Sequence, residues 1–331
     1  IMATYKEING TAVQNVAGNP SNPIIGEVWY NSTAGTFRIF KVDTNGAWAT
    51  GNAMNVKRDD SAGAGAGTQT AGLVFGGDTV PPGKVQTESY NGSNWTEVND
   101  MNTGRSQFGG VGTQTAALAF AGDAGSPTSN TETWNGSNWT ETTNLNTARA
   151  NIGAAGTNTA ALGFAGYIPG SGSQVITELW NGSNWTEVNN LNTARQTLAG
   201  FGTQTATIAA GGVGPSGPDG GAQTELWNGT NWTNVNNLNT GRYALGNTGT
   251  STEGLVFGGA FPIQAAAELT ESWNGTNWSV GPELNDERAQ LGGSFGSAAA
   301  AVACGGIVNY ANVNTIEKFN SPAQTTQTID Q

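Results

Sequence analysis

The chain of 331 residues contains no histidine and only one cysteine, Cys304. The missing imidazole excludes Ser-His-Asp and Cys-His nucleophile systems, HExxH zinc sites and copper sites with histidine ligands. A single cysteine excludes an intrachain disulfide. Lys and Arg together number 12 against 24 Asp and Glu, and the resulting net charge of -12 argues against nucleic acid as a partner.

Long apolar runs are also missing. No segment approaches the roughly 20 apolar residues of a membrane helix, so no membrane insertion is expected. The first residues, IMATYKEING, lack a basic start followed by an apolar stretch, which predicts that no secretory signal is present. Charged residues make up only 11%, but 11 Trp and 11 Phe require a buried core, so the 50 glycines do not indicate disorder.

Repetition is what the chain has in abundance. A tryptophan recurs every 44 to 47 residues, at 48, 95, 139, 185, 232 and 278, and an arginine follows each one ten residues later. Each period reads as four strands: one after the arginine, an apolar one such as GLVFGG (72–77), one such as TELW, and one starting at the repeat tryptophan. Turns such as NGSN join the last two. Four strands in about 40–50 residues indicate a β-propeller blade.

An apolar strand ending in Gly-Gly, then a variable gap, an aromatic residue and a tryptophan resemble the kelch repeat. The pattern stands here as Phe75-Gly76-Gly77 with Tyr90 and Trp95, and as Phe257-Gly258-Gly259 with Trp273 and Trp278. The double glycine becomes Ala-Gly at 121–122 and 165–166. The resemblance implies an all-β fold, a six-bladed kelch-like β-propeller of four-stranded blades over residues 46–320. It implies no particular activity.

A glutamate two residues before each third-strand aromatic predicts structural ion pairs. Each of the first five precedes a repeat arginine at one constant spacing, as Glu88 precedes Arg105, whereas the last has no arginine ahead of it. We therefore expect Glu317 near Arg58, and a ring closed by pairing of a strand around 47–55 with TIEKFN (315–320). The residues expected in the pairs are Glu88, Glu132, Glu178, Glu225, Glu271, Glu317, Arg58, Arg105, Arg149, Arg195, Arg242 and Arg288. The alternative is that six arginines around a central channel bind an anion.

The copies differ most between their second and third strands. These loops are 78–86, 123–130, 167–176, 213–223, 260–269 and 307–314. Because successive strands run antiparallel, the loops emerge on one face, which predicts a binding rim on a rigid scaffold. Tyr167, Phe261 and Tyr310 are the candidate binding residues, since aromatic side chains are enriched at binding hot spots. The alternative is loop drift without selection.

The N-terminal region carries a second resemblance. YKEINGTAVQ (5–14) and PSNPIIGEVWYNSTAGTFRIF (20–40) resemble the start of structural proteins of tailed phages, marine ones above all, including tail-fibre proteins. The resemblance implies that residues 1–45 are an attachment region. Within it, GEVWYN (26–31) and TFRIFKV (36–42) predict a short β-hairpin, and we expect a C-terminal tail at 321–331 after the propeller. Residues 26–45 could instead join a blade.

The phage resemblance also implies a location and partners. It implies a virion protein that is made in the host cytoplasm, acts outside the cell and is oligomeric on the particle. Its implied partners are other virion proteins and a host-surface glycan or protein. We expect a non-enzymatic appendage, fibre or decoration component with no catalytic, cofactor or metal site.

Two other functions stay open. The first is a sialidase-like, glycan-acting propeller enzyme, although NGSNWT has the hairpin and tryptophan of the Ser-x-Asp-x-Gly-x-x-Trp box without its aspartate. The second is a cellular kelch scaffold that binds a peptide. The repeated Trp and Asn also suit a sugar, but we interpret them as packing and turn residues.

Overall fold

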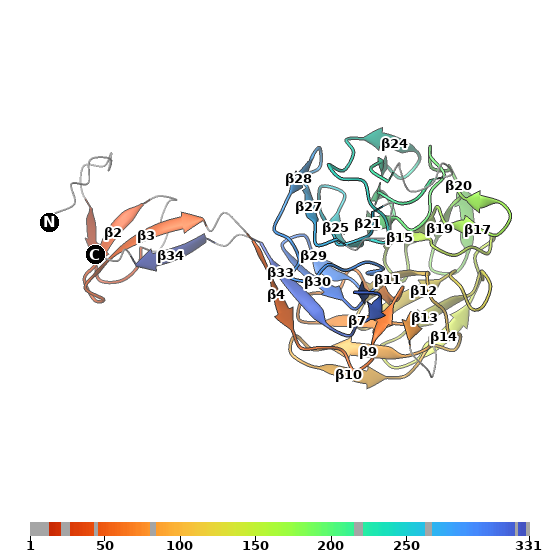
Figure 1. Ribbon diagram of the computed structural model, residues 1–331, viewed down its shortest axis with the longest axis horizontal. Helices are drawn as coiled ribbons and strands as arrows, with labels where there is room; N and C mark the ends of the chain where they lie inside the picture. The colour runs from red at the N-terminus through yellow and green to blue at the C-terminus, as the bar shows by residue number, and fades with distance from the viewer. Residues whose placement is uncertain are drawn as a thin grey trace. The chain divides into compact units, whose positions relative to one another are not determined.

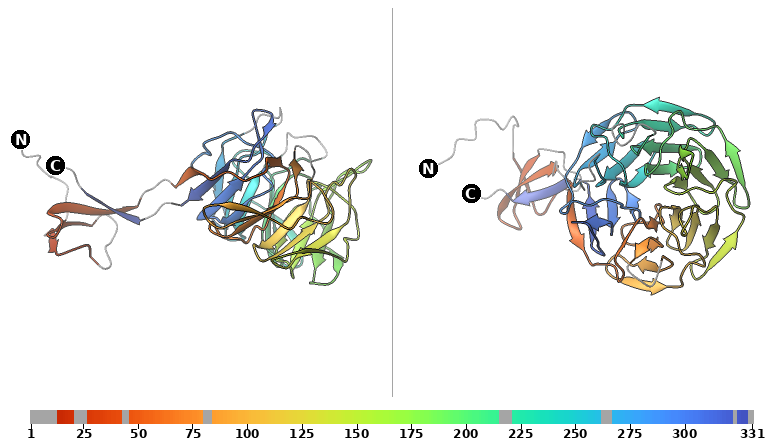
Figure 2. Two further views of the ribbon diagram at one scale, coloured as in Figure 1. Left: turned by 90° about the horizontal axis from the view of Figure 1, so that it is seen from below. Right: turned by 45° about the vertical axis from the view of Figure 1, so that its right-hand side comes forward.

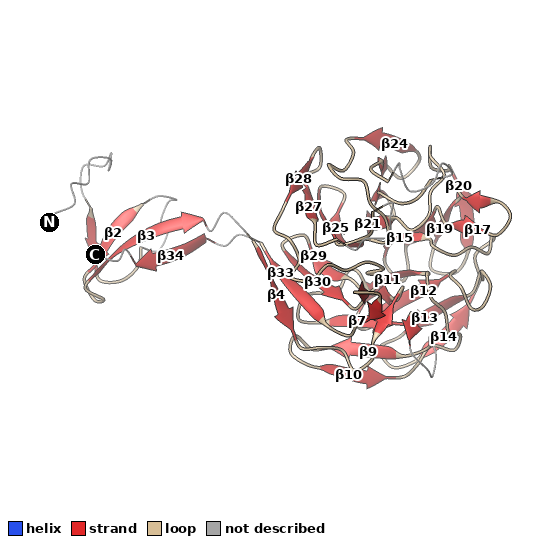
Figure 3. Cartoon of the chain, viewed as in Figure 1, coloured by secondary structure: helices blue, strands red, loops and turns tan. Residues whose placement is uncertain are grey.

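The computed structural model describes residues 13–20, 27–42, 46–79, 84–214, 221–261, 267–321 and 324–328. These residues form strands, turns and loops, and none of them lies in a helix (Figure 3). Accordingly, none of these residues belongs to a helix of the length and apolarity that crossing a membrane requires. The chain divides into two compact units, residues 1–46 with 321–331, and residues 47–320.

The smaller unit is built on one four-stranded sheet. Its strands lie in the order β1 (Gln14–Val16), β2 (Val28–Asn31), β3 (Thr36–Val42) and β34 (Gln324–Thr328). β2 and β3 form an antiparallel hairpin inside the region 26–45. β34 pairs antiparallel with β3, so the segment 321–331, expected as a separate tail, contributes a strand to this sheet. That strand could not be predicted, because its residues QTTQT lack the apolar alternation of a half-buried strand.

The larger unit contains six four-stranded antiparallel sheets among its described residues. The first three comprise β6 (Ala62–Gly63), β7 (Gly72–Phe75), β9 (Thr87–Tyr90) and β10 (Trp95–Val98); β11 (Gly109–Thr113), β12 (Ala116–Phe120), β13 (Thr131–Trp134) and β14 (Trp139–Thr142); and β15 (Gly153–Gly156), β16 (Ala161–Phe164), β19 (Thr177–Trp180) and β20 (Trp185–Val188). Figures 1 and 2 show the sheets of this unit arranged radially about a common centre, which is consistent with a β-propeller.

The other three sheets continue the series. They comprise β21 (Ala199–Thr203), β22 (Ala206–Ala210), β23 (Thr224–Trp227) and β24 (Trp232–Val235); β25 (Gly246–Thr250), β26 (Glu253–Phe257), β27 (Thr270–Trp273) and β28 (Trp278–Val280); and β29 (Phe295–Ser297), β30 (Ala300–Cys304), β33 (Ile316–Asn320) and β4 (Ala47–Gly51). The sixth sheet thus combines both ends of the unit, and Trp48 lies opposite Phe319 in the β4–β33 pair.

Burial within each sheet follows the repeat. Second strands such as β12 are apolar and buried, whereas fourth strands bury mainly their tryptophan. The Trp185 ring packs on Phe120 of the preceding sheet with centroids 4.7 Å apart, and its Nε1 donates to Thr131 Oγ1 at 3.2 Å. The same donation to a threonine is made by Trp48, Trp139, Trp232 and Trp278. These tryptophans therefore join neighbouring sheets and are not free to stack on a sugar.

Replacing Trp48 by alanine is expected to destabilise the larger unit by roughly 3–5 kcal/mol, because loss of a buried aromatic ring leaves a cavity. The ring packs on Phe257 and Phe319, with centroids 4.8 and 5.3 Å away. Unfolding in guanidinium chloride measures the loss. Val280→Ala is the control, since Val280 is 68% exposed, and it should change the free energy of unfolding by less than about 0.5 kcal/mol. Equal effects would contradict the packing role of Trp48.

Candidate functional site

Each sheet of the larger unit contains a buried pair between a repeat arginine and a repeat glutamate. The N–O distances run from 2.5 to 3.1 Å, and these side chains are at most 2% exposed. The pairs are Arg58–Glu88, Arg105–Glu132, Arg149–Glu178, Arg195–Glu225, Arg242–Glu271 and Arg288–Glu317. The arginines therefore do not line an open anion site.

The expected register of these pairs was wrong. Glu317 contacts Arg288 rather than Arg58, and each glutamate pairs with an arginine 27 to 30 residues before it. The reason lies in the sheet: the arginine comes just before the first strand and the glutamate sits in the third strand of the same sheet. The arginine that follows a glutamate in the chain already belongs to the next sheet.

The glutamate also holds the link that leads into its sheet. Glu225 Oε2 accepts hydrogen bonds from the backbone N–H and the side-chain amide of Asn192, both at 2.8 Å. Glu225 Oε1 accepts from Thr193 N–H and from Arg195, whose guanidinium also donates to the carbonyl of Gly211. Buried charges need this density of partners, because otherwise their desolvation outweighs their attraction. The pair with its link is thus a structural clamp.

The guanidinium of the clamp in the second sheet stays charged at neutral pH. Burial lowers the pKa of Arg105 to about 10, against the opposing attraction of Glu132, so the guanidinium stays charged. The Glu132 carboxylate also accepts hydrogen bonds from the backbone N–H groups of Asn102 and Thr103, which lie in the link. The charges therefore act as connectors between link and sheet.

Arg288 allows a matched test of the clamp, because it contacts two carboxylates that differ in burial. Glu317 is 1% exposed at 2.8 Å, and Asp286 is 54% exposed at 3.3 Å. Glu317→Gln is expected to cost about 3–5 kcal/mol, since it leaves a buried cation without its counter-ion. Asp286→Asn makes the same chemical change at the surface and should cost at most about 1 kcal/mol. Urea unfolding compares the two, and similar losses would refute the clamp.

A ring of backbone hydrogen bonds joins the six sheets just ahead of their first strands. Its members are the residues two positions after each repeat arginine, namely Asp60, Gln107, Asn151, Thr197, Ala244 and Gln290. Each N–H donates to the carbonyl of the member before it, and Asp60 donates to Gln290, over 2.7 to 3.1 Å. All six are left-handed, with φ between 47° and 58°. They surround a small hollow of about 80 Å³, which we call the channel mouth.

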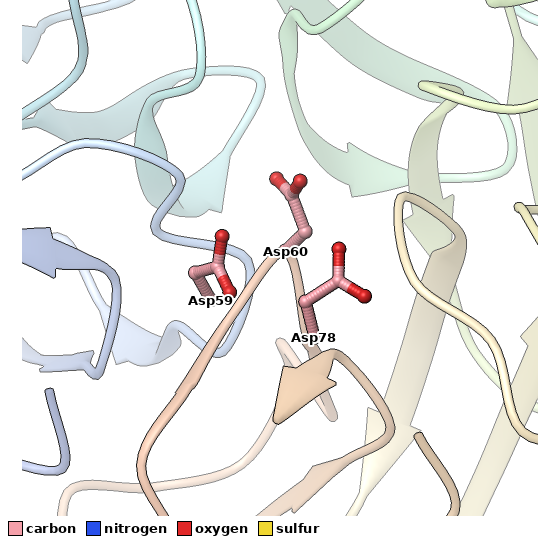
Figure 4. A group of neighbouring side chains, drawn as sticks. All are labelled: Asp59, Asp60 and Asp78. Atoms are coloured by element: carbon pink, nitrogen blue, oxygen red, sulfur yellow. The ribbon is translucent and has the colours of Figure 1, made fainter. Parts of the chain in front are cut away.

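Three acids form a cluster at the first sheet, and Asp60 is the one of them that lines the channel mouth. Asp59 and Asp78 face each other in the two-residue ladder of β5 (Arg58–Asp59) and β8 (Asp78–Thr79), and Asp60 follows Asp59. One carboxylate oxygen from each lies within 4.8 Å of the others (Figure 4). The equivalent cross-strand positions elsewhere are Ser106–Asp123, Ala150–Tyr167, Gln196–Val213, Tyr243–Ala260 and Ala289–Ile307. Only this copy therefore sets two acids opposite each other in the described residues.

Protein groups hold each of these carboxylates. Asp60 Oδ2 accepts from the amides of both neighbouring ring members, Gln107 and Gln290, at 3.1 Å. Asp59 Oδ1 accepts from Asn312 Nδ2 at 2.6 Å. Asp78 pairs with Lys84 at 2.8 Å. The three acids are thus built into a hydrogen-bonded network that ties the first sheet to both its neighbours.

Burial gives this cluster unusual acid–base properties. Desolvation, reinforced by Asp59, raises the pKa of Asp60 to about 7. Desolvation, reinforced by Asp78, raises the pKa of Asp59 to about 6. The group can hold a proton near neutral pH, and its oxygens are of the kind that divalent cations take. No such site was predicted from the sequence, although RDD (58–60) and GGD (76–78) are acidic where the other copies are mostly neutral.

The three expected binding aromatics differ in exposure. Tyr310 is 93% exposed at the tip of the hairpin formed by β31 (Ile307–Val308) and β32 (Ala311–Asn312), with φ of 62°. Tyr167 and Phe261 are partly buried. The hairpin reaches the acid cluster through Asn312, which donates to Asp59. Parts of the variable loops, residues 80–83, 215–220 and 262–266, lie outside the described residues.

Comparison with protein-family models and with curated proteins finds no match to this chain. Function is therefore inferred from the site itself and from the resemblances in the sequence.

The acid cluster predicts that stability falls as pH rises. A carboxyl group whose pKa is higher in the folded than in the unfolded chain stabilises the fold below about pH 4, and this contribution is lost as pH rises through the folded pKa. For Asp60 that folded pKa is about 7. Asp60→Asn keeps the acceptor oxygen but cannot ionise. The free energy of unfolding of this variant, relative to that of the wild type, should therefore rise from about pH 4 to about pH 7. Thermal or urea unfolding across this range measures it, and a pH-independent difference would contradict it.

Proposed function

We propose that the larger unit is a closed, six-bladed β-propeller of the kelch type. The ring of backbone hydrogen bonds supports closure, since Asp60 donates to Gln290 across the junction of the first and sixth sheets. A shared core at the same junction supports it as well. There, Trp95 of β10 lies 6.2 Å from Phe295 of β29, in one cluster with Val302 and Cys304.

The propeller serves, in this proposal, as a non-enzymatic recognition module that contacts a host surface or neighbouring subunits through the rim of variable loops. The observation that carries it is Tyr310. A bulky residue in the left-handed region is uncommon and costs free energy, and such outliers gather at functional positions. Here that conformation holds an aromatic ring 93% exposed at a hairpin tip, where it buries almost nothing. An exposed ring of this kind is suited to become buried in a partner.

We further propose that the protein is a component of a phage virion, such as an appendage, fibre or decoration protein. This step is supported by the N-terminal resemblance in YKEINGTAVQ (5–14) and PSNPIIGEVWYNSTAGTFRIF (20–40). The smaller unit, which holds those segments, then attaches the module to other virion proteins, and the particle acts outside the cell. Variable loops on a constant scaffold suit a protein whose binding target on the host surface changes.

Tyr310→Ser tests the recognition surface. Binding of the purified protein to a panel of marine bacterial cells and to arrayed bacterial polysaccharides should weaken at least about tenfold, since a hot-spot aromatic contributes about 2 kcal/mol or more. Val280→Ser is the matched control, because Val280 is also exposed but lies in strand β28 and not in a variable loop. If binding survives Tyr310→Ser and is lost in Val280→Ser, the contact face is a different one. If neither protein form binds a cell or a glycan, a role toward neighbouring subunits is tested by incorporation into particles.

The acid cluster is the one observation that favours the second candidate, a glycan-acting enzyme. Asp60 at the channel mouth and the adjacent Asp59 both have raised pKa values, and glycosidases use a carboxyl pair in which one member stays protonated. Release of reducing sugar from bacterial polysaccharides, abolished by Asp60→Asn and retained by Asp286→Asn, would establish the enzyme instead. Retention of Tyr310-dependent binding without turnover would leave recognition as the function.

A further inference from the structure

A central cavity of about 380 Å³ lies among the first strands of all six sheets of the larger unit. Its size falls in the range of small-molecule sites, about 300–1,000 Å³. The cavity is separate from the channel mouth. Five buried apolar side chains line both hollows and so form a floor between them: Phe108, Ile152, Leu198, Leu245 and Leu291.

The opposite end of the cavity is hydroxylated and open. Thr157, Thr203, Thr250 and Ser297 line it at the turns after the first strands, and all four are exposed. This is the face of the constant GTQT-type turns, not the face of the variable loops. Access is therefore from the side that the proposed recognition rim does not use.

One side chain inside the cavity breaks the repeat. Asn247 stands five residues after its repeat arginine, where the other copies have Gly63, Gly110, Ala154, Gly200 and Gly293. It lines the cavity, is partly exposed, and its amide group has no hydrogen-bond partner among the described residues. A primary amide offers two donors and one acceptor, so the cavity presents an unused polar group where the frame itself needs only a small residue.

We infer that the central cavity binds a small neutral polyhydroxylated molecule of the monosaccharide class, with the Asn247 amide as its specific contact. Neutrality follows from the lining, which has no Asp, Glu, Lys or Arg among its described residues, so an ion entering it would lose water without gaining a counter-charge. A sugar ring matches the two kinds of surface present. Its C–H face can lie on the apolar floor while its hydroxyl groups meet Asn247 and the threonine hydroxyls.

Saturation-transfer difference NMR on the full chain tests the site with D-glucose, D-galactose and N-acetyl-D-glucosamine, and with D-glucuronate as the charged counterpart. At least one neutral sugar should receive magnetisation, and D-glucuronate should bind more weakly than D-glucose. Asn247→Ala should weaken binding roughly five- to tenfold, the effect of one lost hydrogen bond. Alanine fits this position, as Ala154 shows in the third sheet, so folding should be retained.

Asn184→Ala is the matched control, since Asn184 is an exposed turn asparagine that does not line the cavity. It should leave sugar binding unchanged. Tyr310→Ser should also leave it unchanged, which separates this site from the recognition rim. The inference is overturned if no neutral sugar receives magnetisation up to its solubility, or if binding survives Asn247→Ala at full strength.

Discussion

The buried arginine–glutamate pair is the contact on which the other features of the larger unit depend. It fixes the backbone just ahead of each first strand. The residues that face the centre then follow that arginine at constant distances in the sequence. The hydrogen-bonded ring is built two residues later, the apolar floor three residues later and the cavity position five residues later, as Arg195, Thr197, Leu198 and Gly200 illustrate. One ion pair per sheet thus sets the register of three successive layers around the centre.

Because the frame is copied in every sheet, the positions that depart from it are informative. Three departures stand out: the acids Asp59, Asp60 and Asp78, the amide of Asn247, and the exposed ring of Tyr310. In a repeat protein each unit is supported chiefly by its neighbours, so single positions can change without loss of the core. The acid cluster and the Tyr310 hairpin lie on the same side of the larger unit, linked through Asn312, whereas Asn247 lies beyond the apolar floor.

The strands and their order could be predicted well, because the tryptophan, arginine and glycine markers recur at nearly constant spacing. Trp48 could be placed opposite the TIEKFN strand for the same reason. The prediction of the ion pairs failed because constant spacing is ambiguous. A repeat glutamate lies at a regular spacing both from the arginine after it and from the arginine before it. For Glu317, only the arrangement of the strands in the sheet decides between Arg58 and Arg288. The acid cluster stayed hidden because β6 and β7 separate Asp59 from Asp78 in the chain, and the two meet only through the β5–β8 ladder.

The pairing of Ala47 with Asn320 has a consequence for how this chain can change over time. Both ends of the larger unit leave from adjacent strands of one sheet, while the flanking strands β3 and β34 pair with each other in the smaller unit. In topology, the larger unit is an insertion into a β-hairpin. An insertion whose two ends lie side by side can be removed or replaced by another module without lengthening or breaking the host hairpin. Exchange of residues 47–320 for another module with adjacent ends would therefore leave the pairing of β3 with β34 in place.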